Sequence, residues 1–208
     1  MALNLKHITK SDRQKVYPPS QDTFLLIDSV KSDLLFIQSL NPGIIMEIGV
    51  GSGAVLTSLS IETSLSSYFL GADINPAATE LAYNTLKLND CQRFDLVTID
   101  VFNTMNLSGK LDIIICNPPY VITSSEEYEE CQKRKDISSS FAGGENGREF
   151  IDKLMKFAQV NLSENGVMYM LFEEHNGNFS GRVLSQQRQG CEGLAVIRMN
   201  KSEIAAYA

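Results

Sequence analysis

The chain has 208 residues, of which 43% are apolar and 21% are charged, values typical of one globular domain with a proper core. Its net charge of −7 argues against tight, sequence-independent binding to DNA or RNA, because such binding depends on neutralising phosphates with lysine and arginine. No apolar run approaches the length of a membrane span, and the first residues lack the pattern of a secretory signal.

Cysteine and histidine usage predicts reduced thiols and no metal site. The cysteines are scattered, without a Cys-x-x-Cys pair, and few histidines accompany them, so sequence spacing cannot assemble a zinc site; these residues are Cys91, Cys116, Cys131, Cys191, His7 and His175. Reduced thiols are typical of the cytosol and the nucleus, so we expect a cytoplasmic protein that can also be nuclear.

The N-terminal part predicts an extension followed by one helix. Residues 1–21 form the extension, of which 1–16 are polar and expected to be loose, and Tyr17-Pro18-Pro19-Ser20 predicts a turn. Apolar residues recur at helical spacing over residues 22–40, with Ser20 or Asp22 as the cap. The breaker Asn41-Pro42-Gly43 ends this helix.

From residue 44 onward, short apolar runs alternate with helical patterns. Strands are predicted over residues 44–48, 68–72, 94–99, 111–116, 167–172 and 194–199, with 182–185 in the place of one more strand. Such alternation predicts a doubly wound, mostly parallel α/β sheet within a single domain, residues 1–208. Residues 121–146 are polar and rich in glycine and serine, and we expect them to form a loop region that faces the substrate.

The tetrapeptide Asn117-Pro118-Pro119-Tyr120 is the most informative motif of the chain. It follows the predicted buried strand 111–116, and its two prolines lock two φ angles and remove two backbone donors. The result is a rigid turn at the carboxyl end of a parallel strand, where open α/β sheets bind ligands. Asn117 offers one acceptor and two donors there, which suits a planar amino group held still while its nitrogen attacks. An ordinary Asn-Pro turn would leave the same pattern.

Carboxylates come at the ends of the first three predicted strands, as Glu47, Asp73 and Asp100, and should converge at one edge of the sheet. The turn Gly49-Val50-Gly51-Ser52-Gly53 follows Glu47, but it lacks both the dinucleotide spacing and a cation to meet phosphate. A carboxylate after the second strand suits a ribose diol, and a carboxylate after the third strand suits the exocyclic amine of adenine. A carboxylate beside the glycine turn suits a cation. The set predicts S-adenosylmethionine, although each acid by itself is also typical of a helix cap.

Segments 17–26, 47–53, 117–121 and 142–149 resemble those of the HemK-like class I S-adenosylmethionine-dependent methyltransferases. The first and the last are more specific than the glycine turn. The short N-terminal region resembles the eukaryotic/archaeal branch, whose members methylate N5 of the glutamine in the Gly-Gly-Gln motif of a class I translation termination (release) factor. Methylation of histone lysine and of N6 of DNA adenine has also been attributed to this branch, and both stay open as alternatives.

The resemblance implies a seven-stranded, Rossmann-like sheet with the strand order 3-2-1-4-5-7-6. The cofactor contacts that it implies are Thr23, Glu47, Gly49, Gly51, Asp73, Ile74, Asp100, Val101 and Asn117. The catalytic group that it implies is Asn117, which would hold the substrate amide, with Pro118 and Tyr120 beside it. Eukaryotic members of the branch work with a small zinc-binding activator protein, which implies a heterodimer.

We expect catalysis by orientation rather than by a protein nucleophile. A glutamine side-chain nitrogen is a poor nucleophile because its lone pair is delocalised into the carbonyl group. We expect the Asn117 side-chain oxygen to accept one substrate N–H and the Pro118 backbone carbonyl to accept the other, while Tyr120 covers one face. The same geometry would serve an adenine amine, so this motif by itself does not name the substrate.

The predicted strand 94–99 lies at one edge of a sheet with this order. Leu96, Val97 and Ile99 make it apolar, and an apolar edge with unpaired backbone groups is a liability unless it is covered. We expect the activator to dock there, and a loop of the same chain is the alternative.

The segment after the fifth predicted strand is shorter than in relatives, which carry a helix there. Residues 173–181 are typical of a loop, whereas a parallel crossover usually needs a dozen or more residues. Either the sixth strand is absent or misplaced, or the chain is a shortened variant with one sheet face poorly covered. The second case leaves open a catalytically impaired protein that acts as a binding module.

Overall fold

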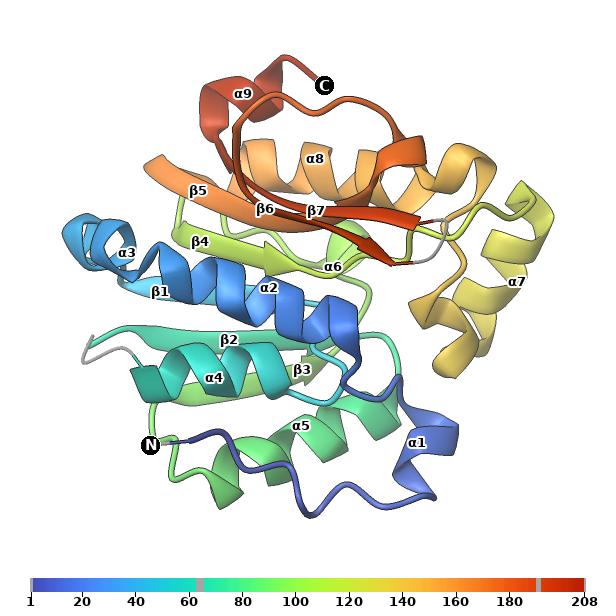
Figure 1. The fold of residues 1–208 in the computed structure, drawn as a ribbon, viewed down its shortest axis with the longest axis horizontal. Helices are drawn as coiled ribbons and strands as arrows, with labels where there is room; N and C mark the ends of the chain where they lie inside the picture. The colour runs from blue at the N-terminus through green and yellow to red at the C-terminus, as the bar shows by residue number, and fades with distance from the viewer. Residues whose placement is uncertain (1, 63–65, 190–191, 208) are drawn as a thin grey trace.

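The computed structural model describes residues 2–62, 66–189 and 192–207, so Cys191 lies outside the described residues. One seven-stranded sheet has the order β3-β2-β1-β4-β5-β7-β6, which confirms the predicted order (Figure 1). Its strands are β1 (Ile44–Ile48), β2 (Tyr68–Asp73), β3 (Phe94–Thr98), β4 (Leu111–Cys116), β5 (Leu162–Glu173), β6 (Arg182–Gln189) and β7 (Glu192–Asn200).

The first five strands are parallel, and β7 runs antiparallel between β5 and β6. Strand β4 is apolar except for Asp112 near its start. Ile113 and Ile115 pack on one face of the sheet, and Ile114 packs on the other, all fully buried. A central parallel strand covered on both faces has no polar side, so it lacks hydrophobic alternation.

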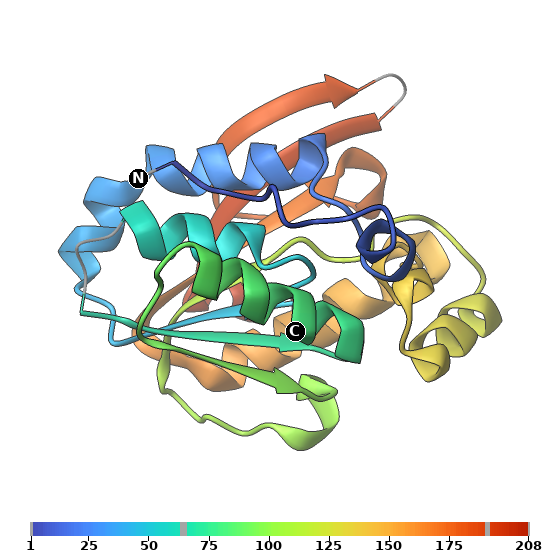
Figure 2. The ribbon, with the colours of Figure 1, turned by 90° about the horizontal axis from the view of Figure 1, so that it is seen from below.

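Helices cover both faces of the sheet (Figures 1 and 2). One face carries α2 (Gln21–Ser32), α3 (Leu34–Leu40), α4 (Ala54–Glu62) and α5 (Pro76–Leu88). The other face carries α6 (Val101–Thr104), α8 (Glu149–Asn161) and α9 (Lys201–Ala205). In the part of the chain that the structure describes, no helix has the length and apolar character needed to cross a membrane.

The helix predicted over residues 22–40 is in fact two helices, α2 and α3, which meet at Asp33. The backbone of Asp33 leaves the helical region, with φ −105° and ψ 13°. Its carboxylate accepts hydrogen bonds from the Tyr169 hydroxyl (2.9 Å) and from Arg198 Nη1 (2.5 Å), on β5 and β7. These tertiary contacts break a helix that local propensity alone would continue.

The expectation that residues 1–16 are loose is wrong. Ile8 and Val16 are buried against α5, on either side of the short helix α1 (Asp12–Lys15). Two hydrogen bonds join Asn4 to Asn89, from the Asn4 N–H to Oδ1 (2.8 Å) and from Nδ2 to the Asn4 carbonyl (2.9 Å). A few apolar side chains therefore suffice to fix a mostly polar segment on the surface of the domain.

The expectation of a loop over residues 121–146 is also wrong in part, because α7 (Ser125–Arg134) lies within it. Ser124 caps this helix, since its hydroxyl accepts the Glu127 N–H at 3.2 Å, and Tyr128 and Cys131 are buried. Two 3₁₀ turns follow, η1 (Ile137–Ser140) and η2 (Glu145–Gly147). In Figure 1, α7 lies beyond the carboxyl ends of the strands and faces them.

Strand β6 is present and correctly placed, although the connection that precedes it is short. Between β5 and β6 the chain forms only the 3₁₀ turn η3 (Glu174–Asn176) and an irregular segment. Phe179 of that segment packs on the sheet face that a helix would cover, with its ring 4.9 Å from that of Phe172 and 5.3 Å from that of Tyr207. Val183 on β6 is 44% exposed, but Ile197 and Met199 on β7 are fully buried, so this exposure lies at the edge strand.

Candidate functional site

A pocket of about 380 Å³ opens at the carboxyl ends of the strands. Its walls come from the glycine turn after β1, the ends of β2 and β3, the turn after β4, the start of α2, and the α7–η1 region. Every predicted site residue lines it: Thr23, Glu47, Gly49, Gly51, Asp73, Ile74, Asp100, Val101, Asn117, Pro118 and Tyr120. Residues far apart in the sequence thus meet because parallel strands end at the same edge.

Asn117 is held in one orientation by Asp22. Its Nδ2 donates to Asp22 Oδ2 at 2.9 Å. A carboxylate only accepts hydrogen bonds, so the amide nitrogen must face Asp22 and the amide oxygen must face away from it. Among the described residues, the buried Oδ1 of Asn117 has no hydrogen-bond partner. A buried polar atom without a partner in a pocket wall is suited to a donor on a ligand.

Sequence reasoning missed this role of Asp22, which it treated only as a possible helix cap. Ser20 is the N-cap, and Thr23 Oγ1 accepts the Ser20 N–H at 3.2 Å. Asp22 is only 4% exposed and also accepts from the Tyr17 hydroxyl at 3.2 Å. A carboxyl group in the first turn of a helix is common, so no sequence signal separated this one from an ordinary helix-terminal acid.

The glycines of the turn after β1 have two different roles, one in packing and one in leaving room for a ligand. A Cβ at Gly53 would lie 2.8 Å from Ala82 Cα, so this position lets α4 pack against α5. A Cβ at Gly49 would meet no atom within 4 Å, and this residue lines the pocket. The first glycine therefore leaves room for a ligand close to the backbone, whereas the third serves the packing of the domain.

Glu47 is buried at the end of β1, where its Oε2 accepts the Leu56 N–H from the first turn of α4 at 2.8 Å. Burial raises the pKa of Glu47 well above its ordinary value; the hydrogen bond from Leu56 opposes the shift, and the nearby Asp73 adds to it. A buried carboxylate of this kind is suited to a cationic ligand, because a positive charge would stabilise its ionised form.

Asp73 and Asp100 are each held by backbone N–H groups. Asp73 accepts from Gly51 (3.0 Å) and Asn75 (2.9 Å), and burial raises its pKa although these bonds oppose the shift. Asp100 caps α6 by accepting the Phe102 N–H at 3.0 Å, so the helix-cap alternative holds for it. The cap does not exclude ligand binding, because a carboxylate has about four acceptor positions.

We expect the affinity for S-adenosylmethionine to rise with pH over the range in which Glu47 and Asp73 ionise. Their pKa values are raised in the free protein, so a cationic ligand that needs the ionised forms must release protons on binding. The effect of these two groups on folding stability has the opposite sign. A carboxyl group whose pKa is raised in the folded state contributes stability at low pH, and this contribution is lost as pH rises through that pKa. Calorimetry from about pH 5 to about pH 8, in buffers of different ionisation enthalpy, measures both the affinity and the released protons.

The control for this measurement is Glu47→Gln, which is expected to weaken the pH dependence and the proton release. An affinity independent of pH in the unmodified protein would contradict the assignment of these acids to the cation.

The far wall of the pocket comes from α7 and α8. Lys153 Nζ lies 4.8 Å above the Tyr128 ring and donates to the Tyr128 hydroxyl at 3.3 Å. Burial, with the negative charges of Glu149 and Asp100, raises the pKa of Tyr128 to about 12, so this hydroxyl stays protonated at neutral pH. Gln132 lies one turn beyond Tyr128 on α7, and its buried Nε2 has no hydrogen-bond partner among the described residues.

The segment 142–149 packs directly against the Asn117–Tyr120 turn. The Val121 N–H donates to the Phe141 carbonyl (3.1 Å), and the Gly143 N–H donates to the Val121 carbonyl (2.8 Å). Gly147 has a positive φ of 66°, and a Cβ there would collide with the Tyr120 carbonyl oxygen. Glycine in this motif is therefore required by the close approach of two loops.

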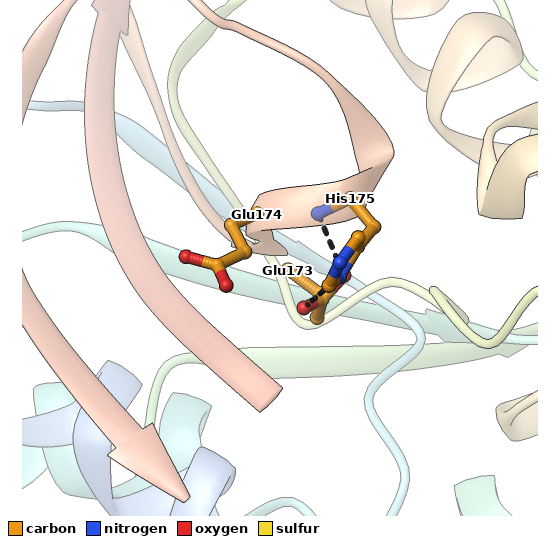
Figure 3. Close-up of side chains that lie close together, drawn as sticks. All are labelled: Glu173, Glu174 and His175. Carbon is orange, nitrogen blue, oxygen red and sulfur yellow. Dashed lines mark hydrogen bonds and ion pairs between the residues drawn. The ribbon is translucent and has the colours of Figure 1, made fainter. Parts of the chain in front are cut away.

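One cluster of described residues, Glu173, Glu174 and His175, has potential metal-ligand atoms within 4.8 Å of one another (Figure 3). The Glu173 carboxylate already accepts hydrogen bonds from the His175 N–H (2.7 Å) and Nδ1 (2.8 Å), and from the Gly193 N–H (3.3 Å). Figure 3 shows the Glu174 side chain directed away from this pair. The cluster is therefore explained by the local structure of η3 and carries no metal assignment.

Solved methyltransferases share this fold. The rRNA methyltransferase aviRa from Streptomyces viridochromogenes matches 92% of this chain and 89% of its own, with a TM-score of 0.58 at 15% identity. The sheet order, with the pocket at the strand ends, is thus that of the class I methyltransferase fold.

Sequence comparison narrows this class to a family. Residues 23–133 match the family described as methyltransferase small domain. The methyltransferase HEMK2 of Mus musculus is 30% identical, over 94% of each chain. The eRF1 methyltransferase catalytic subunit mtq2 of Schizosaccharomyces pombe is also 30% identical, over 89% of each chain. The chain belongs to the HemK2-like family of S-adenosylmethionine-dependent methyltransferases, which confirms the resemblance seen in its motifs.

Proposed function

We propose that this protein methylates N5 of the glutamine in the Gly-Gly-Gln motif of a class I translation termination factor. The observation that carries the proposal is the amide oxygen of Asn117, which Asp22 directs away from itself and which has no partner among the described residues. The name of the fungal relative, a catalytic subunit of an eRF1 methyltransferase, supports the same substrate.

The chain's own groups suit S-adenosylmethionine and an amide. Glu47 would meet positive charge, Asp73 the ribose and Asp100 the adenine amine. When bound, S-adenosylmethionine supplies an electrophilic methyl group. The Asn117 side-chain oxygen and the Pro118 backbone carbonyl would accept the two N–H groups of the substrate amide and stabilise the positive charge that develops on its nitrogen. One of those protons then leaves to water, and the product is the neutral methylamide.

A primary carboxamide matches the unpartnered polar groups of the pocket better than an amine does. Asn117 Oδ1 is an acceptor without a partner, and Gln132 Nε2 is a donor without one, among the described residues. A carboxamide presents N–H groups and a carbonyl oxygen, and so can satisfy both kinds of group. A lysine amine has no carbonyl oxygen, and its lone pair is used in the attack on the methyl group, so it would leave Gln132 unmatched. Duplex DNA is disfavoured by the net charge of −7.

The proposal is tested by methyl transfer from labelled S-adenosylmethionine to a Gly-Gly-Gln termination factor, a histone and duplex DNA, each with and without the zinc-binding activator. We expect label in the termination factor, lost when its motif glutamine is replaced by alanine. Label only in histone or DNA would overturn the glutamine assignment. Binding of S-adenosylmethionine without any transfer would favour the impaired binding module that the shortened connection leaves open.

We further propose that the activator docks along the outer edge of β3. Strand β3 pairs only with β2, and no described segment pairs with its other side. An exposed aromatic side chain lies beside it: Tyr83 of α5 is 49% exposed and contacts the Phe94 ring edge-on. The fungal relative is named as a catalytic subunit, which supports the presence of a partner. An apolar sheet edge of this kind favours strand or surface docking.

Tyr83→Glu is expected to weaken binding of the activator by at least about tenfold, because it places a charge in the apolar surface beside β3. Leu35→Glu is the matched control, since Leu35 is 84% exposed on α3, which lies apart from β3 (Figure 1). Calorimetry or interferometry measures the affinity of each variant for the activator. Equal affinities for the two variants, or a chain that is fully active and monodisperse alone, would contradict docking at this edge.

A further inference from the structure

We propose that Asn176, in the short connection between β5 and β6, is a positioning residue for methyl transfer that fixes the far end of the Asn117–Tyr120 turn. This inference rests on the proposed methyl transfer, but not on the identity of the substrate.

Asn176 uses both ends of its side-chain amide. Its Nδ2 donates to the Tyr120 carbonyl at 3.0 Å and to the Asn146 carbonyl at 3.2 Å, and its Oδ1 accepts the Glu173 N–H at 3.0 Å. The residue is 1% exposed, so water does not compete for these bonds. One side chain therefore joins the active-site turn, the segment 142–149 and the end of β5.

The Asn176 amide is closely packed where it meets the Tyr120 carbonyl. Gly147 lies so close that a Cβ there would collide with both the Tyr120 carbonyl oxygen and Asn176 Nδ2. A water molecule has little room to take the place of a donor in such a crowded position. Loss of the Asn176 amide would thus remove the hydrogen bond that ties the Tyr120 carbonyl to the connection between β5 and β6.

The turn η3 holds Asn176 in this position. Glu173 and Asn176 cap η3 reciprocally, and the Glu173 carboxylate lies beneath His175 (Figure 3). The His175 N–H and Nδ1 and the Gly193 N–H all bond to that carboxylate, and together these bonds outweigh burial and lower the pKa of Glu173. The short connection is therefore a well-ordered support, although it lacks a helix.

The consequence for catalysis follows from the two ends of the turn. Asp22 fixes Asn117 at one end, and Asn176 fixes Tyr120 at the other. Pro118 lies between them, and its carbonyl is the proposed second acceptor for the substrate amide. Small displacements of such a group are costly, because a shift of about 1 Å can lower a rate by about 100-fold.

The test compares Asn176→Asp and Asn176→Ser with the control Asn178→Asp, an exposed neighbour in the same connection. Asn176→Asp keeps the shape but places a carboxylate, which cannot donate, against two carbonyl groups. We expect kcat to fall about 10- to 100-fold in both Asn176 variants, with the dissociation constant of S-adenosylmethionine within about twofold of that of the unmodified protein. The control is expected to retain kcat.

The readouts separate positioning from mere stability. Each variant's Tm is measured with its kcat, and kcat is taken well below that Tm; a lowered Tm with unchanged kcat would overturn the inference. If Asn176→Asp does not fold, the milder Asn176→Ser decides in the same way. If the unmodified protein labels histone or DNA instead of the termination factor, the proposed glutamine function fails, and the Asn176 variants are compared on the substrate that is labelled. If it labels none, both proposals fail.

Discussion

Asn117→Ala is expected to lower the rate of methyl transfer by about 100- to 1000-fold, the range typical of losing one acceptor or donor aimed at developing charge. The variant removes the oxygen proposed to accept a substrate N–H, while the carboxylates that would bind S-adenosylmethionine stay in place. The expected signature is a fall in kcat that is much larger than any loss of cofactor affinity, since Asn117 is one of several implied cofactor contacts. Single-turnover transfer and calorimetry of S-adenosylmethionine measure the two quantities separately.

Asp22→Asn is the informative companion variant. It keeps the size of the side chain, but an amide at this position can donate to Asn117 as well as accept from it, so the Asn117 amide is no longer held in one orientation. We expect a smaller loss of kcat, about tenfold, again with the cofactor bound. Full activity of Asn117→Ala with intact cofactor binding would refute the proposed role of this oxygen.

Asp33→Ala is expected to destabilise the fold by about 3–5 kcal/mol, the usual cost of breaking a buried ion pair from one side. Asp33 accepts from Arg198 Nη1 at 2.5 Å and from the Tyr169 hydroxyl at 2.9 Å, and both charged side chains of this pair are largely buried. Arg198 lies with its guanidinium 3.5 Å from the centre of the Phe36 ring, so it cannot move to water without losing this contact. The variant would leave its charge buried and unpaired.

The control for Asp33→Ala is Asp28→Ala, at an exposed position of α2. Urea unfolding of both variants gives the free energies of unfolding, and we expect the control to change by less than about 0.5 kcal/mol. Equal losses in the two variants would show that the Asp33 network contributes nothing beyond an average surface acid.

The sequence by itself determined the class of fold and the main walls of the site. The strand 111–116 is apolar except for Asp112 because both of its faces are buried, and the residues that follow parallel strands meet at one sheet edge. For this reason the sequence predicts that Glu47, Asp73, Asp100 and Asn117 meet at one edge of the sheet, and they line one pocket together.

Only the tertiary structure decided how these groups are held. The bond from Asn117 to Asp22 joins residues 95 positions apart, and the bond from Asn176 to Tyr120 joins residues 56 apart, so no local pattern encodes either pairing. The break at Asp33 likewise depends on side chains from β5 and β7. Local periodicity reports which face of an element is buried; it does not report which distant polar group meets a given side chain, because that depends on how the completed layers pack.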